Sequence, residues 1–302
     1  MMERYLSANE YFKKIFGEKV QRISIDAGFS CPNRDGTKGI GGCIYCSSTG
    51  SKASYTNSTL SVKEQIEDGL KLFKNKARKF IAYFQAFSNT YAHLTKLKEI
   101  YKPAIEHPDV VGISIGTRPD CIDDEKLDYF EEIAKEKFLI IEYGVQTLND
   151  SSLLFINRGH NSAQSIEAIR KTKKRKNINI VAHLIFLLPE DNLENMIYTI
   201  KTLVDEGVNG FKFHHLYVER NTTIEKLYTE GKINLLELEE YIEILGKVIS
   251  ILPQDIVLHR LFGDCSKDNL IAPLWTLNKT ANINLLRKYL TEKDIYQGKF
   301  AI

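Results

Sequence analysis

The feature that most constrains the fold of this chain is a regular alternation of short β-branched runs and longer amphipathic stretches, from about residue 20 to about residue 220. Several of the short runs, such as VVGISI and FLIIEYGV, are almost continuously apolar, which is typical of strands buried on both faces of a parallel sheet. Strand–helix alternation predicts right-handed βαβ units and therefore an α/β fold with a parallel sheet, either open or curled into a barrel. The predicted strands are residues 22–26, 80–84, 110–115, 139–145, 178–186 and 210–216.

The number of these units limits the size of the barrel. Six lie before residue 220, which is too few for a full eight-stranded barrel. The chain then continues with a helical stretch at 235–252, a short apolar run at 255–261 and a helical tail at 284–290. No linker interrupts it, and 43% hydrophobic residues in a chain of 302 suffice for one large core. We expect a barrel with an N-terminal extension over residues 1–220, and a C-terminal extension over 221–302 packed on it as one structural unit.

The charge and hydropathy of the chain bear on whether it is a nucleic-acid-binding, membrane or secreted protein. The net charge of +2 is not that of a general nucleic-acid binder, although local basic patches remain compatible with RNA binding. No apolar stretch approaches the length of a membrane span, and the start MMERYLSANEYFKKIFGEK is too charged for a signal peptide. We therefore expect a cytoplasmic protein without a membrane partner.

Three of the five cysteines cluster directly after the first predicted strand. Cys31 and Cys43 enclose eleven residues, Cys43 and Cys46 enclose two, and the loop between them is rich in Gly, Asp, Asn and Pro. In a reducing compartment such a cluster indicates metal binding or catalysis rather than disulfides. Thiolates suit zinc or an iron–sulfur cluster, both of which usually take four protein ligands, so three cysteines leave one position open for chemistry. A structural zinc clip, completed by a distant His or by Cys121 or Cys265, remains the alternative.

Two basic runs have no assigned partner in the sequence. Residues 170–176 (RKTKKRK) carry six positive charges in seven positions, and residues 71–79 (KLFKNKARK) form a second run. Such runs are usually solvated helix ends, where cations suit the helix dipole. If both lay on one side of the protein, they would form a patch able to follow a phosphate backbone.

Ten short segments follow one another along the chain: IDAGFSCPNRDG, GGCIYC, YFQAFSNTYA, ISIGTRPDCI, EYGVQT, NRGH, HLIFLLPED, FKFHHLYV, LHRLFGD and IAPLW. In this order they resemble the radical S-adenosylmethionine (SAM) superfamily, and within it the YhcC/YtqA family. That family is related to the Elongator catalytic subunit and to the anaerobic coproporphyrinogen dehydrogenases. The resemblance implies a partial (β/α)6 barrel of the TIM type, with its active site where the strands end. It also implies that Cys31, Cys43 and Cys46 hold a 4Fe–4S cluster whose open iron binds SAM. An electron from a donor such as flavodoxin or ferredoxin then cleaves SAM to a 5′-deoxyadenosyl radical.

The resemblance further implies a tRNA substrate. Similar proteins are associated with converting 5-carboxymethylaminomethyluridine to 5-aminomethyluridine at the wobble position, and an unstacked wobble base is able to enter a barrel mouth. Two alternatives remain open at this point. One is a radical SAM enzyme acting on a small molecule or a protein, and the other is a zinc-clipped interaction module without enzymatic activity.

Several residues match the positions that bind SAM in these relatives. Residues 84–91 occupy the place of a segment whose backbone holds the SAM amino group, and Gln146 and Arg158 have the spacing of a Gln and an Arg that grip its carboxylate. An Arg fork suits a carboxylate because it is bidentate and permanently charged. His183 replaces an acidic residue used for the SAM ribose, although a lone His among apolar residues is more often a core residue. The predicted cofactor-binding residues are Tyr45, Gln85, Ser88, Asn89, Glu142, Gln146, Arg158 and His183.

Strand alternation predicts which further side chains face the barrel interior. It places Lys212 and His214 on one face of the sixth strand, opposite Phe211 and Phe213. A Lys inside a barrel mouth is a candidate for function, so Lys212 and His214 are the predicted catalytic residues, with a solvated strand end as the alternative. Glu142 shares a face with Gly144 and Gln146, within reach of SAM or Lys212, and Thr117, Arg118 and Asp120 follow the third strand toward the same edge.

Overall fold

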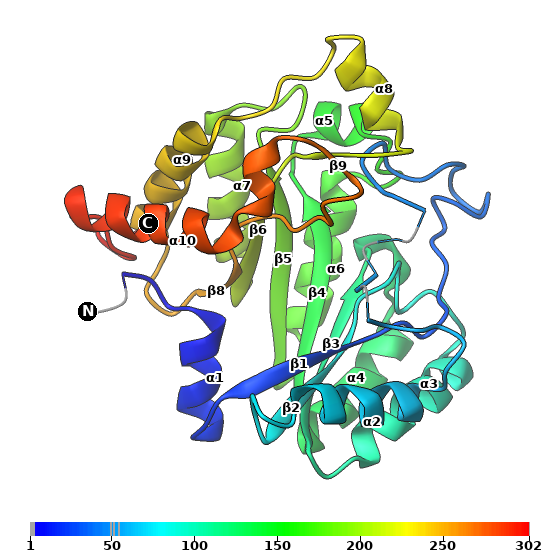
Figure 1. Cartoon of the computed structure of the whole chain (residues 1–302). Coiled ribbons are helices and arrows are strands. Elements are labelled where there is room, and N and C mark those ends of the chain that lie inside the picture. Colours follow the sequence, from blue (N-terminus) through cyan, green and yellow to red (C-terminus); the bar gives the residue numbers. More distant parts are fainter. Residues whose placement is uncertain (1–3, 49, 51, 54, 302) are drawn as a thin grey trace.

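The computed structural model describes residues 4–48, 50, 52–53 and 55–301 (Figure 1). Within them, seven strands form one parallel sheet that is curled into a half-barrel, and each strand lies beside its predecessor in the sheet. This order is what successive right-handed βαβ units produce. The strands are β1 (Val20–Ile25), β2 (Lys79–Phe84), β3 (Val110–Thr117), β4 (Phe138–Gln146), β5 (Ile178–Phe186), β6 (Gly210–His215) and β8 (Val257–Arg260).

All six predicted strands are confirmed, and the sheet has one strand more than the six units counted from the sequence. The additional strand, β8, comes from the apolar run expected at 255–261 and pairs in parallel with β6. Its four residues are too few to show a period, so only the pairing identifies it as a strand. The segment after residue 220 therefore contributes to the sheet itself.

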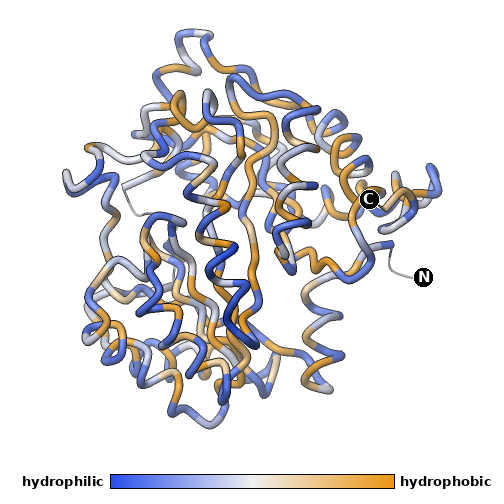
Figure 2. Tube along the Cα trace, turned by 180° about the vertical axis from the view of Figure 1, so that it is seen from behind, coloured by the Kyte–Doolittle hydropathy of each residue, from blue (hydrophilic) through white to orange (hydrophobic). Residues whose placement is uncertain are grey.

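Helices cover the outer face of the sheet, and their apolar sides form the main core with the outward-facing strand residues, including Phe211 and Phe213. Figure 2 shows hydrophobic residues concentrated along the central strands, whereas the surrounding helices alternate in hydropathy, as expected for amphipathic helices. These helices are α2 (Val62–Phe73), α3 (Leu94–Glu106), α4 (Asp124–Glu136), α6 (Ser162–Lys173), α7 (Leu193–Asp205), α9 (Leu238–Ile251) and α10 (Lys279–Glu292).

Shorter elements complete the edges of the fold. Strands β7 (Val218–Glu219) and β9 (Leu270–Ala272) form a small antiparallel pair, and α5 (Asp150–Phe155) and α8 (Thr223–Thr229) pack near the cysteine loop. Two 3-10 turns span Pro119–Cys121 and Leu274–Leu277. No helix in the described ranges is both long and apolar enough to cross a membrane.

Helix α1 (Ala8–Phe16) closes the end of the half-barrel at which the strands begin. Its Phe12 is buried in an apolar cluster with inward-facing residues of three strands, Ile81, Ile140 and Val181. The next inward position on β4 after Ile140 is Glu142, so polar side chains begin directly above this plug. The barrel interior is therefore accessible from the edge at which the strands end.

Candidate functional site

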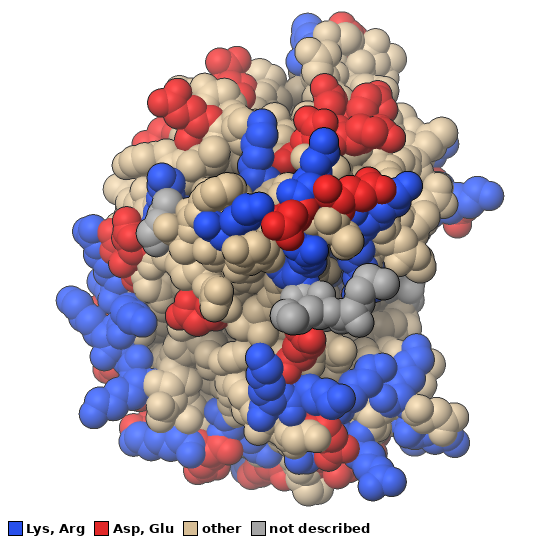
Figure 3. All heavy atoms as spheres, turned by 90° about the vertical axis from the view of Figure 1, so that its left-hand side faces the viewer, with Lys and Arg blue, Asp and Glu red and all other residues tan. Residues whose placement is uncertain are grey.

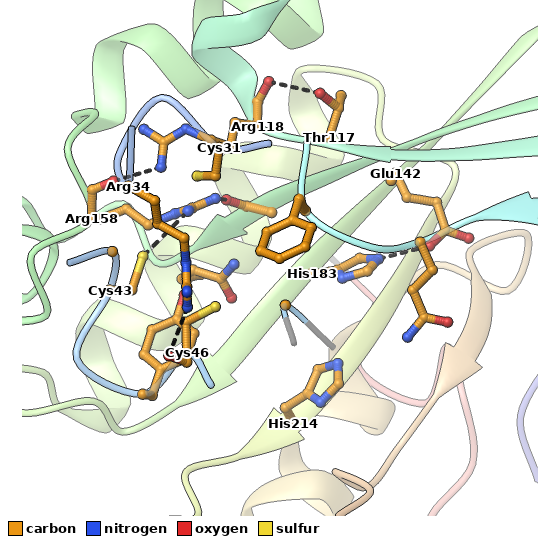
Figure 4. Close-up of a pocket in the computed structure, with 18 of the residues that line it drawn as sticks. Cys31, Arg34, Cys43, Cys46, Thr117, Arg118, Glu142, Arg158, His183 and His214 are labelled. Carbon is orange, nitrogen blue, oxygen red and sulfur yellow. Dashed lines mark hydrogen bonds and ion pairs between the residues drawn. The ribbon is translucent and has the colours of Figure 1, made fainter. Parts of the chain in front are cut away.

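A pocket of about 870 Å³, part of it open to solvent, lies at the edge where the strands end. Figure 4 shows Cys31, Cys43 and Cys46 on one side of the pocket, and Glu142 and His183 on the other. The lining residues come from β2, β3, β4, β5, β6 and β8 as well as from the cysteine loop, so the whole curled sheet shapes the pocket.

Backbone and side-chain hydrogen bonds hold the cysteine loop against the rest of the barrel. The Arg34 amide donates to Cys31 O at 2.8 Å and the Cys46 amide donates to Cys43 O at 3.0 Å, which makes each end of the loop a tight turn. The Arg34 guanidinium donates to Cys46 O at 2.8 Å, and the Ile44 amide donates to Ile156 O at 3.1 Å. The three thiols are thus presented to one pocket by a loop that is anchored on both sides.

The chemistry of the thiols fits an iron–sulfur cluster better than a single ion. In the part of the chain that the structure describes, no group of three or more His, Cys, Asp or Glu side chains lies close enough together to hold one metal ion. The zinc clip considered from the sequence therefore lacks a ligand set among these residues. A cluster is larger than one ion and takes thiolates spaced around it.

Polar groups around Cys43 also fit a cluster. Arg158 Nη1 donates to Cys43 Sγ at 3.5 Å and Asn33 Nδ2 to the same sulfur at 3.8 Å. Hydrogen bonds of this kind tune the potential of iron–sulfur sites. Arg158 Nε and Asn33 Oδ1 are buried and have no partner among the described residues, so both have hydrogen-bonding capacity left for a bound group.

Arg158 is held in place by the strand beside it. Its Nη2 donates to Gly144 O at 2.5 Å, and Arg118 Nη1 donates to Arg158 O at 2.9 Å. A Cβ atom on Gly144 would lie 2.8 Å from Arg158 Nη2 and 2.9 Å from Gln146 Nε2, so a side chain at this position on β4 would displace the ends of both side chains. The structure therefore brings Gln146 and Arg158 together at the pocket wall, as their spacing in the sequence suggested.

The segment after β2 divides into residues that line the pocket and residues that fix its turn. Gln85 lines the pocket, and so does Tyr45 from the cysteine loop. Ser88 and Asn89 are fully buried: the Ser88 hydroxyl pairs with Thr117 Oγ1 at 3.0 Å, and Asn89 Nδ2 donates to Gly116 O at 2.8 Å. The side chains of Ser88 and Asn89 therefore tie the turn to β3 instead of facing the pocket.

At the far side of the pocket, Glu142 is the centre of a buried polar network. It is fully buried and accepts hydrogen bonds from Ser114 Oγ at 2.7 Å, from His183 Nε2 at 2.8 Å and from the Lys212 ammonium. Lys212 also donates to the Tyr83 hydroxyl at 2.8 Å. We call Tyr83, Glu142, His183 and Lys212 the floor network. The floor network lies inside the barrel, as the alternation of side chains along the strands predicts. Lys212 does not line the pocket, because its ammonium contacts Glu142 and Tyr83.

The protonation states of the floor network follow from burial and charge. Burial would raise the pKa of Glu142. The positive charge of Lys212, the hydrogen bond from His183 and the positive charge of Arg22 together lower this pKa well below its usual value, so the carboxylate is ionised. Burial lowers the pKa of His183 to about 4 and that of His214 well below its usual value, so both imidazoles are neutral at pH 7. His214 lines the pocket, and its ring centroid lies 6.0 Å from that of His183.

Arg118 and Asp120 support the pocket without being free to bind a ligand. Arg118 Nε and Nη2 donate to the two Asp120 oxygens at 2.8 and 2.9 Å, and Lys38 Nζ pairs with Asp120 Oδ2 at 2.7 Å. Burial would raise the pKa of Asp120, but these hydrogen bonds and the Arg118 charge lower it to about 2. Because Arg118 also holds Arg158, this pair is an anchor for the pocket wall. Cys121 beside it is buried and Cys265 is partly buried, and neither lines the pocket.

Sequence reasoning missed four residues around the floor network: Tyr83, Arg22, His259 and Arg260. Arg22 Nη2 bonds His259 Nδ1 at 2.6 Å, and its guanidinium lies over the Tyr83 ring at 5.5 Å. Arg260 lines the pocket from the end of β8. The sequence contained a signal for three of them, since Arg22 and Tyr83 lie in two predicted strands and Arg260 lies in the LHRLFGD segment. Whether these side chains face the barrel interior depends on the register of the strands, which the sequence did not give.

Both basic runs lie at the edge opposite to the pocket, because each directly precedes a strand, β2 or β5. Several of their charges are paired: Arg170 with Glu206 at 2.5 Å, and Arg175 with Asp124 and Asp128 at 2.8 Å. On the face in Figure 3, Lys and Arg lie among Asp and Glu rather than in one uninterrupted field. The two runs share an end of the barrel, but it is the end that α1 closes.

Comparisons with known proteins agree with this architecture. Residues 31–203 match the family model of the radical SAM superfamily, and residues 208–292 match that of the radical SAM C-terminal domain. The chain is 37% identical over 300 residues to the uncharacterized protein YtqA of Bacillus subtilis, covering 99% of this chain and 93% of that one. It is 34% identical to protein YhcC of Escherichia coli, covering 93% and 90% of the two chains.

Among solved structures, the fold resembles that of archaeal Elp3 from Methanocaldococcus infernus, with a TM-score of 0.66 and 17% identity. That alignment covers 92% of this chain but only 64% of the Elp3 chain. The partial barrel expected from the sequence is thereby confirmed as the fold.

Proposed function

This chain belongs to the radical SAM superfamily, within the family of YtqA and YhcC, and from that premise we propose that Cys31, Cys43 and Cys46 hold a 4Fe–4S cluster used to cleave SAM. When bound, the cluster and SAM supply a carbon-centred radical that abstracts hydrogen from an otherwise unreactive C–H bond. The observation that carries the proposal is the convergence of these three thiols on one pocket that also receives Arg158 and Gln146. A low-potential donor such as flavodoxin or ferredoxin would deliver the electron.

The residues of the pocket have distinct tasks in this proposal. Arg158 and Gln146 hold the SAM carboxylate, with Arg158 kept in place by Gly144 O and by Arg118. Gln85, Tyr45 and His183 line the space left for the rest of SAM, while Ser88 and Asn89 fix the turn that carries Gln85. Glu142 and Lys212 act as positioning residues, because their mutual contact fixes the wall against which the substrate packs. His214, which faces the pocket and is neutral, is the candidate to contact the substrate.

The cluster is tested by anaerobic reconstitution. The wild-type protein is expected to turn brown, to bind about three to four irons per chain, as one cubane cluster requires, and to release 5′-deoxyadenosine from SAM under reduction. Cys43→Ala is expected to lose both the iron and the product, whereas Cys265→Ala, which alters a cysteine outside the pocket, is the matched control. A Cys43→Ala protein that still forms 5′-deoxyadenosine would contradict the assignment.

For the substrate, we propose the wobble uridine of tRNA, with conversion of the 5-carboxymethylaminomethyl group to 5-aminomethyl. Loss of a hydrogen atom from the methylene beside the carboxylate, and of one electron back to the cluster, would give an imine, whose hydrolysis would break the N–CH2 bond and release the two carbons as glyoxylate. The support comes from relatives that act on the same nucleoside: the chain is 26% identical over 189 residues to the tRNA uridine(34) acetyltransferase of Methanocaldococcus jannaschii, covering 61% of this chain. Nucleoside mass spectrometry of tRNA from a deletion strain tests it. We expect the carboxymethylaminomethyl nucleoside to accumulate, and to disappear again on complementation with the wild-type gene but not with Cys43→Ala.

A second candidate, a radical SAM enzyme acting on a small molecule or a protein, is favoured by one observation. The two basic runs lie at the closed end of the barrel, away from the pocket, so they do not offer a phosphate-binding surface next to it. Unchanged wobble uridines in the deletion strain, together with SAM cleavage that is insensitive to salt and to added tRNA, would favour this candidate, because phosphate contacts weaken steeply with salt.

A further inference from the structure

The floor of the pocket carries more positive than negative charge. Among the described residues that line or face it, Arg22 and Arg260 are permanent cations, and Glu142 is the one carboxylate. Burial lowers the pKa of Lys212 well below its usual value, and its contact with Glu142 favours the ammonium form. Both arginines act electrostatically on Lys212 and on Tyr83, so all three cations surround the same space. Glu142 and Lys212 are buried above the apolar plug of α1 and the two arginines are partly buried, so an unbalanced charge costs more here than it does in water.

Glu142 cannot neutralise this excess. Its two oxygens already accept hydrogen bonds from Ser114, His183 and Lys212, and Arg22 Nη2 lies 3.7 Å from Oε1, beyond hydrogen-bond distance. Three of the roughly four lone-pair sites of this carboxylate are thus occupied, and its single negative charge is matched by its contact with Lys212. Lys212 is the cation matched to Glu142, which leaves the two arginines in excess.

The two arginines also have donors left over. Arg22 Nε is buried and has no partner in the described ranges, while Arg22 itself is fixed between the Phe12 and Tyr83 rings, at 5.6 and 5.5 Å from their centroids. Arg260 lines the pocket and makes no hydrogen bond or ion pair with any residue that the structure describes. A guanidinium has five N–H donors in a fixed fork that matches a carboxylate.

We infer that the floor of the pocket binds a carboxylate of the substrate, with Arg260 as the primary ligand and Arg22 behind it. This inference rests on the proposed function, because the carboxymethylaminomethyl group ends in a carboxylate. SAM does not meet the need: its sulfonium makes it a net cation, and its own carboxylate is assigned to Arg158 at the other side of the pocket.

The arrangement also explains how substrate and product would be distinguished. Glu142 and Gln146 are four residues apart on β4, or about 13 Å along the strand, so the floor lies well below the rim and the uracil ring itself would have to enter the pocket. A carboxylate at the floor would hold the adjacent methylene group in the middle of the pocket. The product has lost the whole carboxymethyl group and keeps only its amine, so it offers no anion to these arginines and should bind less tightly than the substrate.

Three anticodon stem-loop RNAs test the carboxylate site on the reconstituted holoenzyme under anaerobic conditions. They differ only at the wobble uridine, which carries the carboxymethylaminomethyl group, its neutral amide, or the aminomethyl group. We expect the wild type to bind the carboxylate RNA about tenfold or more tightly than the amide, as charge-assisted hydrogen bonds predict. Arg260→Gln should reduce this affinity ratio to about one, because the guanidinium fork is lost. Arg260→Lys should keep part of the ratio, and the surface variant Arg170→Gln should keep all of it.

A second measurement separates failure of this inference from failure of the proposed function. The shift in thermal midpoint of the holoenzyme is recorded with saturating SAM, which occupies Arg158, in acetate, inorganic phosphate and chloride at equal ionic strength. Acetate should stabilise the wild type above chloride and leave Arg260→Gln unshifted, even if no RNA binds and the tRNA proposal fails. Equal acetate shifts in both proteins, a larger shift with phosphate than with acetate, or a carboxylate preference retained by Arg260→Gln in the RNA assay would each overturn the carboxylate site.

Discussion

Replacing Glu142 by Gln should destabilise the protein strongly, and a second substitution should reverse most of the loss. Glu142 and Lys212 are 0% and 1% exposed, and their side chains are in direct contact. Removing one partner of a buried ion pair leaves the other charge uncompensated, which costs about 3–5 kcal/mol. Glu142→Gln also places amide hydrogens against the Lys212 ammonium, so its cost should lie in that range. In the double variant Glu142→Gln/Lys212→Met the buried ammonium that Glu142 compensates is removed as well, and we expect at least about 2 kcal/mol to be regained.

Urea denaturation at fixed cluster occupancy measures these changes. With a slope of about 3 kcal/mol per molar urea, the single variant should lower the midpoint by about 1–1.7 M. Glu106→Gln, which breaks the exposed pair between Lys102 and Glu106 on α3, is the matched control and should cost less than about 0.5 kcal/mol. A double variant that is no more stable than Glu142→Gln would refute the reasoning, because the loss would then not come from an unpaired buried charge.

Three further predictions concern other parts of the molecule. The pKa of Asp120 is lowered to about 2, below the unfolded value of about 3.9. The stabilisation from its ionised form is therefore present above pH 4 and is lost as the pH falls toward 2. Asp120→Asn should lower the urea midpoint at pH 7 and make that midpoint fall less between pH 5 and pH 3. Phe213→Ala, at a fully buried position of the main core, should cost about 3–5 kcal/mol in the same assay, and a loss below 1 kcal/mol would show that the core is not packed there. Replacing Lys174 and Lys176 by Gln, at the closed end of the barrel, should leave wobble-uridine conversion unchanged in complemented cells; a severe defect would mean that the RNA reaches this end.

The sequence predicted the strands and their inner faces well, because both depend on local patterns. Near-continuous apolar runs identify buried parallel strands, and alternation alone put Glu142, Gly144 and Gln146 on the face that lines the pocket. The same reasoning placed Lys212 and His214 inward, and Phe211 and Phe213 outward.

What the sequence did not predict depends on contacts between distant segments. Lys212 and Arg260 are opposite each other in the sheet because β8 lies beside β6, and a run of four residues is too short to be predicted as a strand. The closure of the barrel by Phe12 depends on where α1 docks, which its amphipathic pattern does not specify. The burial of Ser88 and Asn89 likewise results from a tertiary contact with β3.

The inward positions of β4 show how one strand organises the whole site. Ile140 meets the plug of α1, Glu142 anchors the floor network, and Gly144 gives Arg158 room to approach. A reaction that generates a reactive radical requires water to be excluded and nearby charges to be fixed before it begins. The plug excludes water from below, while the contacts of Lys212 with Glu142 and Tyr83 keep its ammonium out of the pocket. Two arginines with donors left among the described residues lie at the two sides of the pocket, Arg158 beside the cysteines and Arg260 at the floor, which favours a ligand set with one carboxylate at each side.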